Sequence, residues 1–125
     1  MPTEPQPITL SEVVRRAVQI IDPDDSDPVA GDFERAFEDD DEPIRAVDDI
    51  EDRVAEVLAE LDPATNNGSL AMAGAVTVYL AYRRDEVGAE PSRLLHLAAE
   101  AEWEGRPPEA VAEWLADRGV RLREA

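Results

Sequence analysis

The sequence contains no cysteine and no lysine, only one histidine, and few aromatic residues. The lack of cysteine excludes disulfide bonds, thiolate metal sites and a cysteine nucleophile. The longest apolar run, Leu70 to Tyr82, is far shorter than the roughly 20 residues that a membrane-spanning helix needs. No positively charged start followed by an apolar run is found at the N-terminus, so nothing indicates secretion. We therefore expect a cytoplasmic protein with no membrane segment.

The length of the chain fits one domain. A protein of 125 residues buries roughly two-thirds of the surface that its unfolded chain exposes. Hydrophobic residues make up 43 % of the sequence, which is enough for one core in spite of the high charge. We expect a single domain over residues 1–125, with residues 1–7 as a flexible N-terminal tail.

The charge is strongly negative. The formal net charge is −18, from 30 acidic residues against 12 arginines. This composition resembles that of proteins from salt-loving archaea, where Asp and Glu hold water and Arg replaces Lys, and the resemblance points to no family. The other explanation is a basic partner, because an acidic surface raises the rate of encounter with a positive one.

The acidic residues are also unevenly distributed. Residues 1–62 hold 20 acids and 5 arginines, a net charge of −15, whereas residues 63–125 hold 10 acids and 7 arginines, a net charge of −3. Adaptation to a salty solvent predicts a more even spread. The asymmetry therefore favours an acidic docking surface in the first half of the chain.

Helical periodicity and helix-capping signals run along almost the whole chain. Thr9 and Glu12 form a capping box, with Ile8 and Val13 at the positions of a hydrophobic staple. Later starts are marked by proline or by a capping residue, Asp27 for the second helix and Ser69 for the fourth, and stops by proline or glycine. We expect an all-α bundle or hairpin array of five or six helices. The expected helices begin at or near residues 10, 28, 43, 69, 91 and 108 and end near residues 21, 38, 61, 84, 104 and 118.

The third expected helix, from Pro43 to Leu61, has one apolar side and one acidic side. Each like-charge step of four residues costs about 0.2–0.5 kcal/mol in dilute buffer, and Arg45 and Arg53 relieve the repulsion only in part. Salt, a bound cation or a basic protein must offset the remaining repulsion between these carboxylates. The candidate partner-binding residues on this side are Asp48, Asp52, Glu56 and Glu60.

The fourth expected helix, from Ser69 to Arg84, has no charge between Leu70 and Tyr82. A helix that is apolar all round belongs in the centre of a bundle or at a subunit interface. We place it at the centre of the fold and keep the interface as an alternative. In that alternative, the small residues Ala71, Gly74 and Ala75 let the backbones of two copies approach closely.

The sequence offers little for catalysis, metal binding or nucleic-acid binding. His96 has Glu100 one turn away, but the Glu-x-x-His pairs of metal-carboxylate bundles are absent. The carboxylates around Asp22 lack the glycine and the final glutamate of an EF-hand loop. DNA binding through a helix-turn-helix would depend on three arginines in an otherwise acidic region, Arg118, Arg121 and Arg123. We expect no cofactor, no metal and no direct contact with nucleic acid.

Two functions of different classes fit these observations. The first is a small, non-enzymatic protein-interaction domain of a salt-adapted cytoplasm, able to associate with itself. The alternative is an acidic inhibitor of the antitoxin, immunity-protein or DNA-mimic type that occludes a basic nucleic-acid-binding surface. A metal or enzyme site built on His96 is a distant third.

Overall fold

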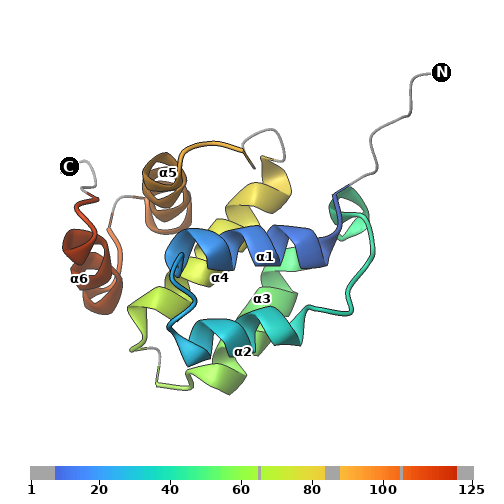
Figure 1. The fold of residues 1–125 in the computed structure, drawn as a ribbon, viewed down its shortest axis with the longest axis horizontal. Helices are drawn as coiled ribbons and strands as arrows, with labels where there is room; N and C mark the ends of the chain where they lie inside the picture. The colour runs from blue at the N-terminus through green and yellow to red at the C-terminus, as the bar shows by residue number, and fades with distance from the viewer. Residues whose placement is uncertain (1–7, 65, 84–87, 105, 121–125) are drawn as a thin grey trace.

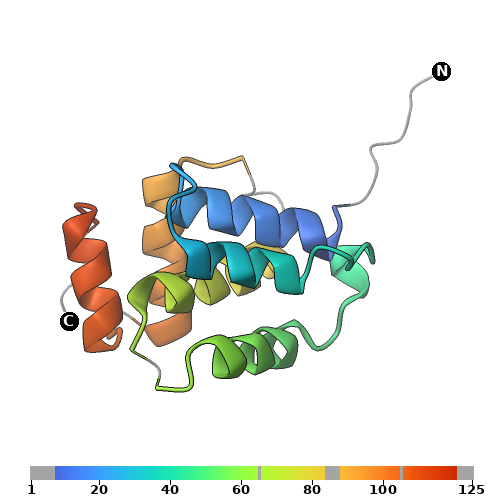
Figure 2. The ribbon, with the colours of Figure 1, turned by 60° about the horizontal axis from the view of Figure 1, so that its bottom comes forward.

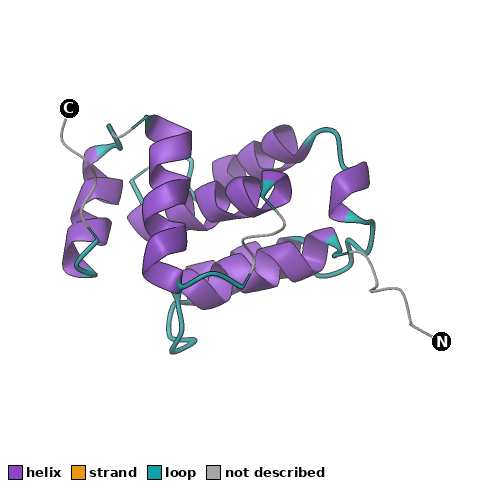
Figure 3. Ribbon diagram, turned by 90° about the horizontal axis from the view of Figure 1, so that it is seen from above, coloured by secondary structure: helices purple, strands orange, loops and turns teal. Residues whose placement is uncertain are grey.

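The computed structural model describes residues 8–64, 66–83, 88–104 and 106–120, so the expected tail at residues 1–7 lies outside the described residues. Figure 3 shows helices joined by loops, with no strand in the described part of the chain. The prediction of an all-α fold with six helices is confirmed. The elements are α1 (Leu10–Ile21), α2 (Pro28–Ala36), the 3-10 turn η1 (Ile44–Ala46), α3 (Ile50–Leu61), α4 (Gly68–Tyr82), α5 (Pro91–Trp103) and α6 (Glu109–Asp117).

Helix α4 lies at the centre of one compact arrangement and contacts every other helix (Figures 1 and 2). It carries no charged side chain, so no side of it has to face water. Val76 and Leu80 are fully buried. The prediction of a central apolar helix is therefore confirmed, and the observed helix begins one residue earlier and ends two residues earlier than expected.

The other helices surround α4 at different angles. Helices α1 and α2 lie side by side, and α3 packs against both α2 and α4 (Figure 2). Helix α5 crosses α4 near one end of the bundle, and α6 lies at that end of the molecule (Figures 1 and 2). The principal helix contacts of α6 are with α4 alone. This arrangement leaves α6 as the helix least tied to the rest of the core.

Helix α1 begins at the Thr9 cap that the sequence predicts, but Glu12 reaches back to the Thr9 hydroxyl and not to its backbone amide. The amide of Glu12 donates a hydrogen bond to Thr9 Oγ1 at 3.3 Å, and the Thr9 hydroxyl donates to Glu12 Oε1 at 3.1 Å. Ile8 packs against the core from the position before the cap. These contacts satisfy part of the hydrogen bonding that a helix start leaves open.

In both the α1–α2 and the α3–α4 connection, an aspartate at the end of the first helix accepts hydrogen bonds from backbone amides of the turn that follows. Asp22 ends α1, and its carboxylate accepts hydrogen bonds from the amides of Ser26 at 3.1 Å and Asp27 at 2.9 Å. The Asp27 amide is the largest cause that lowers the pKa of Asp22. Asp62 ends α3 and accepts from the Asn67 amide at 2.9 Å in the same way. Each aspartate thus positions the residue that caps the next helix, Asp27 for α2 and Asn67 for α4. The capping role also explains the carboxylates around Asp22 that resemble the start of an EF-hand loop.

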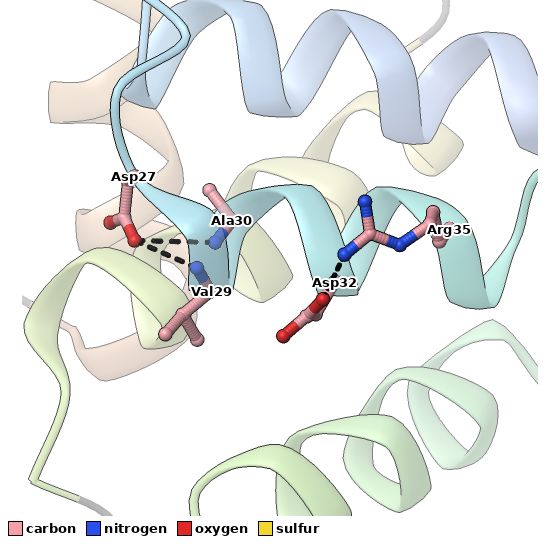
Figure 4. A network of polar contacts seen from close by, with 5 residues as sticks. All are labelled: Asp27, Val29, Ala30, Asp32 and Arg35. Atoms are coloured by element: carbon pink, nitrogen blue, oxygen red, sulfur yellow. Dashed lines mark hydrogen bonds and ion pairs between the residues drawn. The ribbon is translucent and has the colours of Figure 1, made fainter.

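Helix α2 has a side-chain cap at its start and one ion pair further along its exposed side (Figure 4). Asp27 Oδ1 accepts hydrogen bonds from the amides of Val29 at 3.0 Å and Ala30 at 3.4 Å. Asp32 and Arg35, one turn apart on the exposed side, form the ion pair that Figure 4 also shows. The prediction that Asp27 caps this helix is confirmed.

The prediction that Ser69 caps the fourth helix is wrong. The cap is Asn67, whose side-chain oxygen accepts from the Leu70 amide at 3.0 Å. Ser69 lies in the first turn, where its hydroxyl donates to Asp27 Oδ2 at 2.7 Å. This hydrogen bond to the cap residue of α2 links the start of α4 to the start of α2.

The prediction of one continuous helix from Pro43 to Leu61 is also wrong. The chain forms the short turn η1, leaves helical geometry, and begins α3 only at Ile50. The preceding segment is bound to the start of α1, because the Ile44 amide donates to the Ile8 carbonyl at 2.8 Å and the Leu10 amide donates to the Glu42 carbonyl at 3.0 Å. These long-range bonds hold the segment extended, so it cannot join α3.

Candidate functional site

Three exposed carboxylates follow one another along the outer side of α3. Asp52, Glu56 and Glu60 are spaced by one helical turn, and all three are exposed. We call these three residues the acidic band. Asp48, the fourth expected member, is exposed but lies before α3. The four-residue spacing therefore brings together three of the four candidate partner-binding residues on one helix side.

Arg53, which the sequence suggested would offset part of the charge of the acidic band, pairs with carboxylates outside the band. Arg53 pairs with Glu42 and, at 3.0 Å, with Asp49. The hydrogen bond to Glu42 is the largest cause that raises the pKa of Arg53. The side chain of Arg45 lies outside the described residues. Among the ion pairs of the described chain, none includes a carboxylate of the acidic band.

We expect the protein to become more stable as salt is added. The net charge of −18 opposes folding in dilute buffer, and the Debye length falls from about 10 Å at 0.1 M to about 3 Å at 1 M. Thermal unfolding followed by circular dichroism in increasing KCl measures the effect. The rise should be smaller in the variant Asp52→Asn/Glu56→Gln/Glu60→Gln, and a melting temperature that stays level or falls in molar KCl would contradict the expectation.

An apolar groove lies next to α3, on a different side from the acidic band. It has a volume of about 500 Å³ and is lined by residues of α3, of α4, of the last turn of α5 and of the start of α6. Its larger apolar lining residues include Val54 and Leu58 of α3, Trp103 of α5 and Val111 of α6. None of the acidic-band residues lines it. The protein thus has two separate surfaces with binding potential.

The three candidate self-association residues lie together along this groove. Ala71, Gly74 and Ala75 all belong to the stretch of α4 that lines it. A Cβ atom on Gly74 would stand 2.8 Å from Leu58 Cδ1 and 2.9 Å from Val54 Cγ1. The glycine therefore allows α3 to pack closely on α4 within one chain. Self-association through these residues stays a prediction.

Two carboxylates line this groove, and the charge of one raises the pKa of the other. Glu51 on α3 and Glu102 on α5 both line it. Partial burial, and then the negative charge of Glu51, raise the pKa of Glu102. Glu51 also accepts a hydrogen bond from the Tyr82 hydroxyl at 3.4 Å, and its charge is the main cause that raises the pKa of Tyr82. The groove is therefore negative as well as apolar.

His96 pairs with Glu100 on its own helix, as the sequence spacing suggested. His96 Nε2 lies 3.4 Å from Glu100 Oε1, one turn along α5, and both side chains are 36 % exposed. Within the ranges 8–64, 66–83, 88–104 and 106–120, no group of three or more potential ligands gathers to hold a metal ion.

The three arginines weighed for DNA binding are only partly placed. Arg118 stacks over the Trp114 ring, with its guanidinium carbon 3.7 Å from the ring centroid. Arg121 and Arg123 lie outside the described residues. The exposed side of α6 carries three carboxylates spaced by one turn, Glu109, Glu113 and Asp117. This side of α6 is unsuited to phosphate contacts, which need positive charge.

Comparisons with known proteins give no relative for this chain: no protein family, no curated protein and no solved structure matches it. None of the described helices has both the length and the apolar character required to cross a lipid bilayer. The acidic band and the apolar groove are therefore the features from which a function can be inferred.

Proposed function

We propose that the protein is a non-enzymatic protein-interaction domain that binds a basic protein partner in a salt-adapted cytoplasm. The observation that carries this proposal is the acidic band, Asp52, Glu56 and Glu60. These carboxylates are exposed, repel one another along one helix and take part in none of the ion pairs among the described residues. A basic surface would relieve the repulsion and gain complementary charge.

Salt adaptation and partner binding both help to explain why this surface is acidic. Concentrated salt screens exposed carboxylates, which supports a salt-adapted cytoplasm for a protein with a net charge of −18 and no lysine. Screening alone does not explain why residues 1–62 carry −15 of that charge. The uneven distribution supports a directed surface, because a partner needs the charge in one place.

An inhibitor is the second candidate function, and the same asymmetry favours it. An antitoxin, immunity protein or DNA mimic presents carboxylates to a basic surface that otherwise binds nucleic acid. The acidic band offers a row of negative groups at one-turn intervals along a rigid helix. The identity of the partner separates the inhibitor from a general interaction domain.

Neutralising the acidic band should slow the association with a basic partner. The variant Asp52→Asn/Glu56→Gln/Glu60→Gln removes three charges from exposed positions, and surface charges of this kind act mainly on the rate of association. The partner is first recovered from the source cytoplasm at native salt and identified by mass spectrometry. Its association rate with each variant is then measured by surface plasmon resonance.

The matched control neutralises the carboxylates of α6 instead, Glu109→Gln/Glu113→Gln/Asp117→Asn. It changes the net charge by the same amount and also removes a one-turn ladder from an exposed helix side. We expect the α3 variant to associate about tenfold more slowly than the control at low salt, and the difference to shrink in molar KCl. Equal rates for the two variants would show that the acidic band is not the docking surface.

The same α3 variant has a second expected effect on the isolated protein. It removes two like-charge steps on one helix, which should stabilise the fold by at most about 1 kcal/mol in dilute buffer. A gain in stability without any change in partner binding would leave salt adaptation as the role of these residues.

A further inference from the structure

We propose that the apolar groove between α3, α4, α5 and α6 binds an amphipathic, basic α-helix of a partner protein. The apolar side of this helix would lie in the groove, and its Lys or Arg side chains would lie beside Glu51 and Glu102. Three features of the groove support this assignment: the size of its lining side chains, its charge, and the helical form of its walls.

The groove is lined by short side chains from four helices. Ala55, Ala71, Ala75, Ala101 and Ala110 come from α3, α4, α5 and α6. Because alanine leaves room above the backbone, the groove keeps a volume of about 500 Å³ beside the packed core. This volume lies within the range of pockets that receive ligands, about 300–1,000 Å³. It can receive the large apolar side chains of an incoming helix.

The charge of the groove selects a cationic occupant. Its lining includes Glu51, Asp62 and Glu102, and among the residues that the structure describes no arginine or histidine lines it. Glu102 lies in the last turn of α5, where the helix dipole is negative, and this turn contains no basic residue. Glu51 lies in the first turn of α3, at a positive helix end, so the carboxylates themselves favour a positive group in the groove. A second copy of this chain, with its own net charge of −18, is a poor match.

The walls of the groove favour a helix over an extended strand. A bound strand gains its affinity from hydrogen bonds to free backbone groups of the receiving protein. The lining residues Val54, Leu58 and Val78 lie inside α3 and α4, where the backbone groups are bonded within each helix. A helix satisfies its own backbone and offers only side chains. It is therefore the form that this groove can accept.

This inference rests on the proposed function in one respect, namely that the partner is a protein with basic side chains. It uses a different surface, because none of the acidic-band residues lines the groove. The two proposals can therefore fail separately.

The test uses the full-length protein and a fluorescently labelled peptide of about 18 residues, built from leucine and lysine with the leucines on one helical side. One control peptide has the same composition in an order that gives no apolar side. A second has glutamate in place of lysine. Fluorescence anisotropy at about 0.1 M and 1 M KCl measures binding. We expect only the amphipathic lysine peptide to bind at low salt, and its binding to weaken at high salt.

Variants then locate the peptide on the protein. Ala101→Trp fills the groove from an exposed position and should abolish binding, whereas Ala112→Trp on the exposed side of α6 should not affect it. Glu51→Gln/Glu102→Gln should weaken binding about tenfold relative to Glu113→Gln/Asp117→Asn, which removes the same charge from residues that do not line the groove. Thermal melts of all variants check that each one is folded.

Three outcomes would overturn the inference. The first is equal binding of the amphipathic and reordered lysine peptides, and the second is unchanged binding to folded Ala101→Trp. The third is a dimer of the protein in analytical ultracentrifugation that Ala101→Trp dissociates, because the groove would then belong to a second copy. If a recovered basic partner is sensitive to the acidic-band variant but not to Ala101→Trp, the proposed function stands and the groove inference fails.

Discussion

The variant Leu80→Asp is expected to be unfolded at room temperature. Leu80 is fully buried in α4, which contacts every other helix of the fold. An unpaired charge at such a position costs several kcal/mol, a large part of the roughly 5–15 kcal/mol that stabilises a domain of this size. Circular dichroism and size-exclusion chromatography measure the loss of helix and of compact size.

The matched control for this variant is Gln19→Asp. Gln19 is exposed on α1, and its replacement adds the same charge within a helix. We expect a change in stability of about 0.5 kcal/mol or less, as for most surface substitutions. A Leu80→Asp protein with an unchanged melting temperature would contradict the central place of α4.

The second large effect is expected from Gly68→Ala, which should detach α6 from the bundle. A Cβ atom on Gly68 would clash with the carbonyl oxygen of Ala110 and stand 2.9 Å from Trp114 Cβ. The first of these is a backbone atom, so the contact can be relieved only by moving the helix. Overpacking of this kind costs about 1–3 kcal/mol. Because the principal helix contacts of α6 are with α4 alone, the remaining helices should stay folded.

Hydrogen exchange followed by mass spectrometry separates these parts of the chain. In Gly68→Ala, the amides of α6 should exchange much faster, while those of α1 keep their protection. The control is Gly31→Ala in α2, where the nearest atom to an added Cβ is Arg35 Nη1 at 3.8 Å. There the helix propensity of alanine should stabilise the protein by up to about 1 kcal/mol. Equal protection of α6 in both variants would contradict the tight contact at Gly68.

Features that depend on neighbouring residues were predictable from the sequence. The cap at Thr9, the cap at Asp27 and the apolar helix from Gly68 to Tyr82 each involve residues within a few positions of one another. Their energetics are local, so the sequence pattern is enough. The start of α3 was not predictable in this way. It is fixed by hydrogen bonds from residues 42–44 to residues 8–10, which a reading of periodicity along the chain does not include.

The candidate sites show the same division. The acidic band was found because its members are one turn apart on one helix, and Asp48 was misplaced with the start of that helix. The groove was missed because four helices contribute to it. Glu51 and Glu102 meet there only after folding, and in the sequence they are two carboxylates among 30. The alanines of α3, α5 and α6 were the sequence feature that indicated the groove. An alanine on the outer side of a helix leaves space beside the backbone that a longer side chain would fill.

The two aspartate turns also have a consequence for the order in which the chain folds. Asp22 binds amides four and five residues ahead, and Asp62 does the same, so each turn closes a helical hairpin with little loss of chain entropy. Contacts of such short sequence separation form quickly. The hydrogen bonds between residues 8–10 and 42–44 link the first hairpin to the start of the second over a much longer loop. The chain therefore contains two locally encoded hairpins, and the extended segment before α3 is the part whose conformation depends on their docking.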